Sequence, residues 1–364
     1  MTKEQTNLNA ICPYFTMFPL DFPHRILKGK AKANHRVLDP FCGRGTTNFA
    51  ARLLGLDSQG VDASPIAVAI TASKLANTTC SEIISEYHGI LSEYKEVESP
   101  QGEFWKWAFH PEVLNQICYL RQALIDDCSS PARIALRGII LGALHGPRQK
   151  TYQSYFSNQC PRTYAPKPGY AVRFWQRANL HPERVDITDI ICRRTNRYFQ
   201  HNYQASGFAF LGDSRTILFE ETVKEHGKFD WVITSPPYYG MRTYIPDQWL
   251  RNWFLGGPDI VDYSNINQIG HSTPASFAAD LRKVWMNIRG ASNSDANLVI
   301  RFGGITDRKA DPREIIKNSL AESGWRIKTI KAAGTANEGK RQANSFLTKR
   351  SNPVIEYDIW AASA

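Results

Sequence analysis

Two parts of the chain alternate short apolar runs with amphipathic segments, at the spacing expected for strands and helices that follow one another closely. Seven strands are predicted, at residues 35–39, 58–62, 208–213, 229–235, 297–304, 325–333 and 353–361. Helices are predicted between them at residues 46–55, 64–76, 214–227, 275–290 and 311–324. Such alternation is typical of an α/β fold with a parallel, doubly wound, Rossmann-like sheet. We expect the last two strands to form an antiparallel pair at one edge.

The middle of the chain does not follow this alternation. Residues 80–144 have mainly helical patterns, whereas residues 145–177 show little helical or strand periodicity and are rich in Pro, Tyr, Arg and Lys. An irregular stretch of this length is too long for an ordinary connection. We therefore predict one α/β domain made of residues 1–75 and 207–364, with residues 76–206 inserted into it.

Composition narrows the class of protein and its setting. Hydrophobic residues make up 42% of the chain and charged residues 21%, values that are typical of globular proteins, and no apolar run is long enough for a membrane span. The seven cysteines contain no Cys-x-x-Cys pair, so neither a zinc site nor a disulfide framework is expected. The polar start "MTKEQTNLNA" has no secretion signal, which favours the cytoplasm. The net charge of +10 predicts a surface that attracts polyanions; association with the nucleoid is expected if that polyanion is DNA.

A glycine-rich turn follows the first predicted strand, in "VLDPFCGRGTT". Gly43 and Gly45 lie between that strand and a helix, a placement that brings backbone N–H groups toward a ligand. The three-glycine dinucleotide fingerprint is incomplete, because position 48 is Asn. Acids end three strands, at Asp39, Asp62 and Asp213, and Asp62 has the position from which a carboxylate reaches a ribose. Such acids suit S-adenosylmethionine, which is positively charged, better than a dinucleotide.

Together, "DPFCGRGTT", "GVDASPIAVAIT" and "TSPPYYG" resemble the amino-methyltransferases that act on DNA bases. The segment "PYFTMFPLDFPHRIL" is similar to the one that closes over the methionine part of the cofactor in that family. The resemblance covers residues 13–75 and 207–305, is weaker over 306–362, and does not extend to the middle of the chain. It implies a seven-stranded methyltransferase sheet with S-adenosylmethionine as cofactor and no metal. The implied cofactor contacts are Phe18, Asp39, Phe41, Gly43, Gly45, Thr46, Asp62 and Asp213.

The stretch "FDWVITSPPYYG" ends a buried strand with two prolines, which cannot continue a sheet ladder and which hold the backbone extended. The family pattern makes Ser235, Pro236, Pro237 and Tyr238 the catalytic tetrad. Carbonyl groups in such a segment can accept the hydrogens of an exocyclic amine, and Tyr238 can stack on a flipped-out base. Ser at the first position, after Thr234, favours the cytosine N4 amine. Adenine N6 stays open, as do an RNA base amine and a DNA-binding protein without activity.

The cofactor motif precedes the catalytic motif, and the inserted region lies between them. This order resembles that of enzymes whose target-recognition region is in the middle of the chain, although Asp213 here follows the insertion. The predicted DNA contacts are Lys150, Arg162, Lys167, Arg173, Lys340 and Arg341. Basic and aromatic residues mixed in this way suit phosphate and base contacts. Double-stranded DNA is the expected partner, with a cognate restriction endonuclease or other defence-system partner as a further one.

Overall fold

The computed structural model describes residues 1–14, 18–146, 153–158, 167–201, 203, 205–240, 248–262, 272–304, 310–335 and 355–364. The chain divides into two compact units. The α/β unit comprises residues 14–71, 203–243 and 266–364, and the helical unit comprises residues 1–13, 72–202 and 244–265. Segments 1–13 and 244–265 thus group with the helices, whereas the sequence pattern places them with the sheet. The functional division into a catalytic domain and an inserted region stays a prediction.

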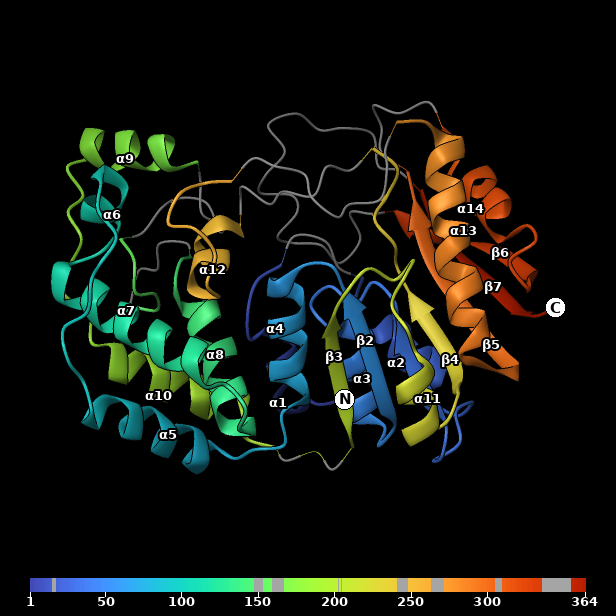
Figure 1. The fold of residues 1–364 in the computed structure, drawn as a ribbon, viewed down its shortest axis with the longest axis horizontal. Helices are drawn as coiled ribbons and strands as arrows, with labels where there is room; N and C mark the ends of the chain where they lie inside the picture. The colour runs from blue at the N-terminus through green and yellow to red at the C-terminus, as the bar shows by residue number, and fades with distance from the viewer. Residues whose placement is uncertain are drawn as a thin grey trace. The chain divides into compact units, whose positions relative to one another are not determined.

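The α/β unit is built on one seven-stranded sheet with the order β3-β2-β1-β4-β5-β7-β6. The strands are β1 (Arg36–Asp39), β2 (Asp57–Asp62), β3 (Gly207–Leu211), β4 (Phe229–Thr234), β5 (Ser292–Gly303), β6 (Trp325–Thr335) and β7 (Ile355–Ser363). Strands β1 to β5 pair in parallel, and β7 runs antiparallel to both β5 and β6. The arrows of Figure 1 show this arrangement. The fold is therefore the predicted Rossmann-like, doubly wound seven-stranded sheet, with the antiparallel pair at one edge.

Helices cover both faces of this sheet. They are α2 (Asp21–Leu27), α3 (Thr46–Leu53), α11 (Glu220–His226), α13 (Pro274–Gly290) and α14 (Pro312–Leu320). Successive side chains of a strand point to opposite faces. Accordingly, Val37 packs in the cluster that contains residues of α2 and α3, whereas its neighbour Leu38 packs with residues of α13 and α14. Helix α4 (Pro65–Leu75) follows β2.

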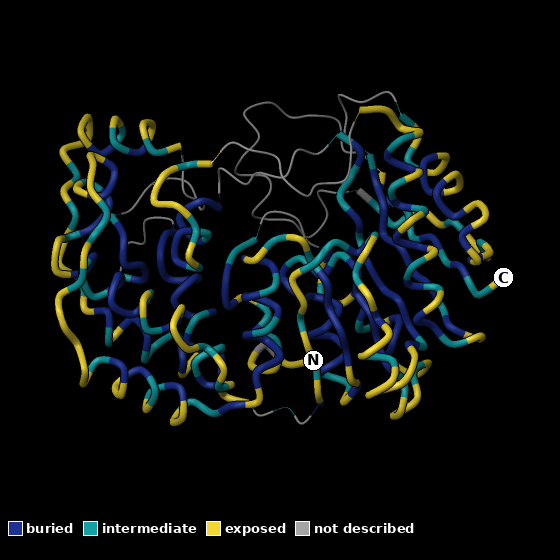
Figure 2. The backbone as a smooth tube through the Cα atoms, in the orientation of Figure 1, coloured by how far each residue is buried: buried dark blue, intermediate teal, exposed yellow. Residues whose placement is uncertain are grey.

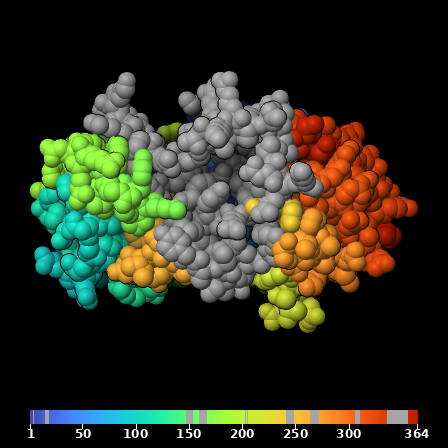
Figure 3. Space-filling view, turned by 90° about the horizontal axis from the view of Figure 1, so that it is seen from above, coloured from blue at the N-terminus to red at the C-terminus, as the bar shows by residue number. Residues whose placement is uncertain are grey.

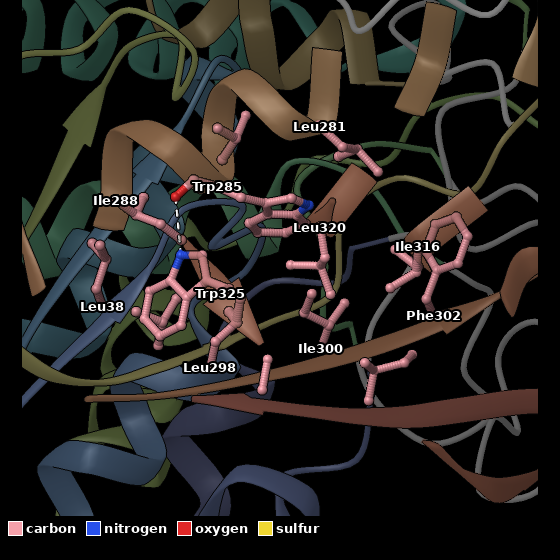
Figure 4. Packing of buried hydrophobic residues seen from close by; sticks show 14 of the residues in the cluster. Leu38, Leu281, Trp285, Ile288, Leu298, Ile300, Phe302, Ile316, Leu320 and Trp325 are labelled. Atoms are coloured by element: carbon pink, nitrogen blue, oxygen red, sulfur yellow. Dashed lines mark hydrogen bonds between the residues drawn. The ribbon is translucent and has the colours of Figure 1, made fainter. Parts of the chain in front are cut away.

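The larger of these two clusters contains a pair of tryptophans. Trp285 of α13 and Trp325 of β6 are both buried, and Trp325 Nε1 donates a hydrogen bond to the carbonyl oxygen of Trp285 at 3.0 Å (Figure 4). A buried indole N–H needs such a partner, because leaving it unpaired would cost free energy. Figure 2 shows the central strands in the colour of buried residues, while edge strand β3 is more exposed. The sheet interior is thus a dry, rigid support for the loops at the strand ends.

The helical unit contains nine helical elements in its described part. They are α1 (Lys3–Thr6), the 3₁₀ helix η1 (Asn7–Ala10), α5 (Cys80–Ser92), α6 (Glu103–Ala108), α7 (Pro111–Asp126), α8 (Pro131–Ala143), α9 (Pro168–Arg177), α10 (Ile187–Tyr198) and α12 (Trp249–Phe254). Its core is rich in aromatic rings. Trp105 of α6 lies 4.7 Å from Trp253 and 5.6 Å from Trp249, both of α12, between ring centroids. In the chain as described, no helix is both long and apolar enough to cross a membrane.

Two predicted segments need correction, and one helix was missed. The helix expected at 214–227 begins only at Glu220, because the N–H groups of Thr216 and Ile217 both bond to the Asp213 carbonyl oxygen and form a turn. The stretch 145–177, expected to be irregular, includes the regular helix α9. There Pro168 occupies the first turn, and Ala171 and Trp175, four residues apart, are buried on one face. Helix α10 was not predicted.

Candidate active site

The turn after β1 has the conformation that its glycines permit. Gly43 and Gly45 have φ angles of 52° and 70°, in the left-handed region that other residues rarely adopt. A Cβ atom on Gly45 would lie 2.6 Å from Thr71 Oγ1, so position 45 also has no room for a side chain. Gly45 is the N-cap of α3, and the turn therefore leads directly into a helix N-terminus. This is the predicted strand–turn–helix geometry.

Asp62 holds this turn from the end of β2. One carboxylate oxygen accepts a hydrogen bond from Gly43 N at 2.9 Å, and the other accepts one from Ser64 N at 2.9 Å. The side chain is half-buried, and burial raises the pKa of its carboxyl above the ordinary value, although the two backbone hydrogen bonds lower it. Each carboxylate oxygen can accept a further bond. Asp62 can therefore bind a diol while it fixes the glycine turn.

Two further predicted cofactor contacts lie on either side of the glycines. Thr46 starts α3, and its hydroxyl oxygen is buried without a hydrogen-bond partner among the described residues. Phe41 is half-buried, and its ring meets that of Trp285 edge-on at 6.3 Å. An unsatisfied buried hydroxyl beside a helix N-terminus is a suitable acceptor or donor for a polar ligand.

Asp39 connects the turn to the catalytic segment. It is 1% exposed, and its Oδ1 accepts hydrogen bonds from the Thr234 hydroxyl at 2.6 Å and from Phe41 N at 3.1 Å. Burial raises the pKa of Asp39 to about 6; hydrogen bonds from Thr234, Thr47 and Phe41 oppose this rise, and the nearby charge of Asp62 adds to it. The Thr47 hydroxyl also donates to the Ile233 carbonyl oxygen at 3.1 Å. Two motifs that are 195 residues apart thus meet at adjacent strand ends.

The predicted tetrad begins immediately after β4. Pro236 is buried, whereas Ser235, Pro237 and Tyr238 are half-buried. The Tyr238 ring meets Phe302 edge-on at 5.4 Å, and its hydroxyl donates a hydrogen bond to Glu356 Oε1 at 2.6 Å. Burial raises the pKa of the Tyr238 hydroxyl well above its usual value, and the charge of Glu356 raises it further. The structure thus brings Ser235–Tyr238 to the strand ends that carry Asp39 and Asp62.

Glu356 was not among the residues predicted from the sequence. A signal for it exists, because "PVIEYDIWA" is an otherwise apolar strand with two acids. The second acid, Asp358, has a structural partner: Arg301 donates to both its carboxylate oxygens, at 2.8 and 2.9 Å. Glu356 accepts a hydrogen bond from the Tyr238 hydroxyl of the catalytic segment.

Asp213 differs from the other two strand-end acids. Its carboxylate accepts from the Arg215 guanidinium at 2.6 Å and from Arg215 N at 2.9 Å, and Arg215 also pairs with Asp280 at 3.0 Å. These hydrogen bonds, chiefly that from the Arg215 side chain, hold the pKa of Asp213 below its usual range. The preceding Gly212 N donates to the Asp62 carbonyl oxygen at 3.0 Å. Asp213 therefore lies beside the site, with its carboxylate engaged in an ion-pair network.

Two aromatic residues of the N-terminal segment have described surroundings. Phe18 is buried in the core cluster of α2 and α3, where its ring meets Phe22 edge-on at 5.2 Å. Tyr14 lies beside the glycine turn, with its Cε1 atom 3.8 Å from the position of a Cβ on Gly43. The contact of Phe18 with the cofactor stays a prediction.

The predicted DNA contacts separate into two groups. Lys150, Arg162, Lys340 and Arg341 lie outside the described residues. Lys167, the N-cap residue of α9, and Arg173 of that helix are exposed in the helical unit, together with Tyr170 and Arg177 (α9 is light green in Figure 3). In the described ranges no three His, Cys, Asp or Glu residues gather in a way that could hold a metal ion.

The glycine turn and Asp62 also lie in a segment that matches a known protein family. Residues 2–73 match the model of the N6/N4 DNA methylase family. Over this segment the match supports the resemblance to the amino-methyltransferases of DNA, and with it the assignment of the chain as a methyltransferase. No curated protein matches the sequence.

Several solved structures show a distant likeness. The rRNA methyltransferase aviRa from Streptomyces viridochromogenes is 12% identical, with 100% of this chain and 94% of that chain covered and a TM-score of 0.36. A putative RNA methyltransferase from Pyrococcus horikoshii is 10% identical over 100% and 98% of the two chains, with a TM-score of 0.37. A SAM-dependent methyltransferase from Methanosarcina mazei is 10% identical over 95% and 98%, with a TM-score of 0.37. Because these scores are low, the sheet order, rather than these structures, defines the fold.

Proposed function

We propose that the protein transfers a methyl group from S-adenosylmethionine to the exocyclic amine of a flipped-out base in double-stranded DNA, and that this amine is cytosine N4. The observation that carries the proposal is the hydrogen bond between Asp39 and Thr234. It joins the glycine turn of the methylase family match to the Ser-Pro-Pro-Tyr segment, so that a cofactor site and an amine-binding segment share one edge of the sheet.

The residues of the turn fit this cofactor. Gly43 and Gly45 allow the backbone to approach a ligand, Asp62 would bind the ribose, and Thr46 would offer its buried, unpartnered hydroxyl. When bound, S-adenosylmethionine supplies a methyl group made electrophilic by its sulfonium. Asp39, ionised above a pH of about 6, places a negative charge at the strand end that suits a cationic ligand.

The catalytic segment would prepare the amine. Pro236 and Pro237 restrict the backbone, which fixes the direction of the neighbouring carbonyl groups. These carbonyls and the Ser235 hydroxyl oxygen would accept hydrogen bonds from the amine, so that its lone pair becomes available for attack. Tyr238 would stack on the base and keep it out of the duplex. The chemistry is positioning with electrostatic help, and it requires no strong general base.

Ser235 is the basis for cytosine rather than adenine as the target. The family has Asp or Ser at this position, and Ser preceded by Thr234 favours the cytosine amine. Adenine N6 is the alternative within the same class.

DNA recognition is assigned to the helical unit. Lys167, Arg173 and Arg177 of α9 are exposed cations, and Tyr170 places an exposed aromatic ring among them. Cations of this kind contact phosphates and make binding depend on salt, whereas base contacts select the sequence. A protein of this type would belong to a restriction-modification or related system, with an endonuclease as its partner.

Long-read sequencing of DNA from cells that express the protein tests this function. The expected result is methylated cytosine at one recurring sequence, which disappears when the Ser235→Ala variant is expressed instead. Methylated adenine at a recurring sequence would change the target base within the same class. Unmodified DNA in cells with abundant, folded protein would contradict a DNA methyltransferase.

A further inference from the structure

The base-stacking residue Tyr238 and the buried acid Glu356 meet at the end of two paired strands. Glu356 lies opposite Gly303 in the antiparallel pairing of β7 with β5. Tyr238 reaches this position from the segment after β4, and its hydroxyl donates to Glu356 Oε1 at 2.6 Å. Glu356 is only 4% exposed, so the carboxylate and the hydroxyl meet in a dry environment.

Gly303 leaves room for this contact. A Cβ atom at position 303 would lie 3.1 Å from Tyr238 Cε2 and 3.2 Å from Glu356 Cγ, closer than atoms usually approach. Gly303 has no positive φ, so the backbone conformation does not require glycine there. Glycine within a strand often marks a place where another group approaches closely. The absent side chain therefore provides the space in which Tyr238 covers the strand end.

A buried carboxylate is costly unless strong hydrogen bonds compensate for it. A hydroxyl that donates to an ionised carboxylate forms a short, charge-assisted bond of this kind. The bond holds the Tyr238 ring at its outer end, while the edge-on contact with Phe302 holds its side. Two separate contacts thus fix the orientation of the ring, which a stacking surface requires before the base arrives.

We propose that Glu356 is the positioning residue of Tyr238, and that Gly303 supplies the space for this contact. The inference rests on the proposed function, because it assumes that Tyr238 stacks on the target base. It assigns the tyrosine hydroxyl a task of its own: the ring contacts the base, and the hydroxyl anchors the ring to β7.

Kinetics of four variants test the anchor. Tyr238→Phe keeps the ring and Glu356→Leu removes the acceptor, so each should lower kcat for DNA methylation by about 10-fold or more. The double variant should be no slower than the slower single variant, because both substitutions remove the same hydrogen bond between Tyr238 and Glu356. Glu356→Gln, which keeps an acceptor oxygen, should lower kcat only about threefold. Affinity for S-adenosylmethionine should stay constant and serves as the test of folding.

Tyr357→Phe is the matched control, since it removes a hydroxyl from the adjacent residue of β7, which pairs with Phe302 and packs against the same cluster as Tyr238. It should leave kcat unchanged. If the effects of Tyr238→Phe and Glu356→Leu multiply in the double variant, the two residues act separately and the inference is wrong. Wild-type kcat in both single variants would also overturn it.

A second readout does not depend on activity, and so separates this inference from the proposed function. In protein labelled with 13C at the tyrosine Cζ atom, the Tyr238 resonance is identified by its disappearance in Tyr238→Phe. Its chemical shift should change in Glu356→Gln and Glu356→Leu, because the acceptor of its hydroxyl changes. An unmoved resonance would show that Glu356 does not bind Tyr238, even if the enzyme methylates DNA. If the wild-type protein transfers no methyl group to DNA, but the Tyr238 resonance still shifts in the Glu356 variants, the proposed function alone is contradicted.

Discussion

The charged residues assigned to the cofactor and those assigned to DNA have opposite environments. In the α/β unit, Asp39 is buried and Asp62 half-buried, and both accept hydrogen bonds from backbone N–H groups at the strand ends. In the helical unit, Lys167 and Arg173 extend from α9 into solvent. Fixed charges in a dry site act strongly on a bound ligand, whereas exposed cations act through the screened field that attracts a polyanion. This difference is the basis on which we propose that the chemistry belongs to the α/β unit and the attraction of DNA to the helical unit.

The largest effect is expected in the catalytic segment of the α/β unit. Ser235→Ala and Tyr238→Ala should each lower methyl transfer by about 100-fold or more, because each removes a group that positions the amine. Cofactor affinity, measured by calorimetry, should change little, since the cofactor is assigned to the ends of β1 and β2. Tyr94→Ala, an exposed tyrosine of the helical unit, is the control and should have normal turnover. Wild-type turnover in either site variant would remove that residue from the tetrad.

Asp62→Ala should produce the next largest effect, on cofactor binding. A hydrogen bond to a charged acceptor contributes about 1.5–3 kcal/mol, which corresponds to a decrease in affinity of roughly 10- to 150-fold. Asp57, at the other end of β2, bonds to Ser206 N and is the matched control. Calorimetric titration of Asp57→Ala should give wild-type affinity. Equal affinities for both variants would place the ribose elsewhere.

Two glycines with the same φ angle separate backbone strain from steric exclusion. Gly45 and Gly55 both have a φ of 70°, but a Cβ on Gly45 meets Thr71, whereas one on Gly55 meets nothing within 4 Å. Gly55→Ala should lower the free energy of unfolding by about 1 kcal/mol. Gly45→Ala should cost more and also weaken cofactor binding, because it distorts the turn. Thermal unfolding with and without S-adenosylmethionine measures both effects, and identical destabilisation of the two variants would contradict the predicted clash.

The smallest effect is expected from the exposed cations. Replacing both Lys167 and Arg173 by Gln should weaken DNA binding severalfold. The slope of log affinity against log salt concentration should also decrease, by up to about one for each phosphate contact that is lost. Lys328→Gln with Lys331→Gln, both exposed on β6, is a control with the same change in charge. Fluorescence anisotropy over a salt series distinguishes the pairs. If both pairs lower the slope equally, net charge rather than α9 attracts DNA.

The same contrast explains what could be predicted from the sequence. The sheet was predictable because strands alternate with helices at short spacing and strands such as β4 and β5 contain apolar runs, while the acids that end β1 and β2 mark their carboxyl ends. The contact between Asp39 and Thr234 follows only from the order of the strands in space, which places β1 beside β4. Glu356 was missed for a similar reason, since its partner Tyr238 is distant in sequence and depends on the position of β7 in the sheet.

The helical unit was less predictable. Helix α9 has only two buried residues, Ala171 and Trp175, in ten positions, so its apolar period is weak beside its many basic and aromatic residues.

In the α/β unit, the ion pairs of Asp213 could not be predicted either, because a nearby arginine, Arg215, pairs with it and with the distant Asp280. The pattern of a strand indicates which acid lies at its end, but not which cation the fold places beside that acid.

The sharpest test of the proposed methyl transfer to DNA is a reaction with methyl-labelled S-adenosylmethionine, followed by mass spectrometry of the nucleosides. Duplex DNA and transfer RNA are offered separately to the wild-type protein and to Ser235→Ala. We expect label in the DNA as N4-methylcytosine, no label in the RNA, and no label in either with the variant. Label in the RNA alone, or a protein that binds the cofactor but leaves duplex DNA unlabelled, would contradict the assignment of a DNA methyltransferase.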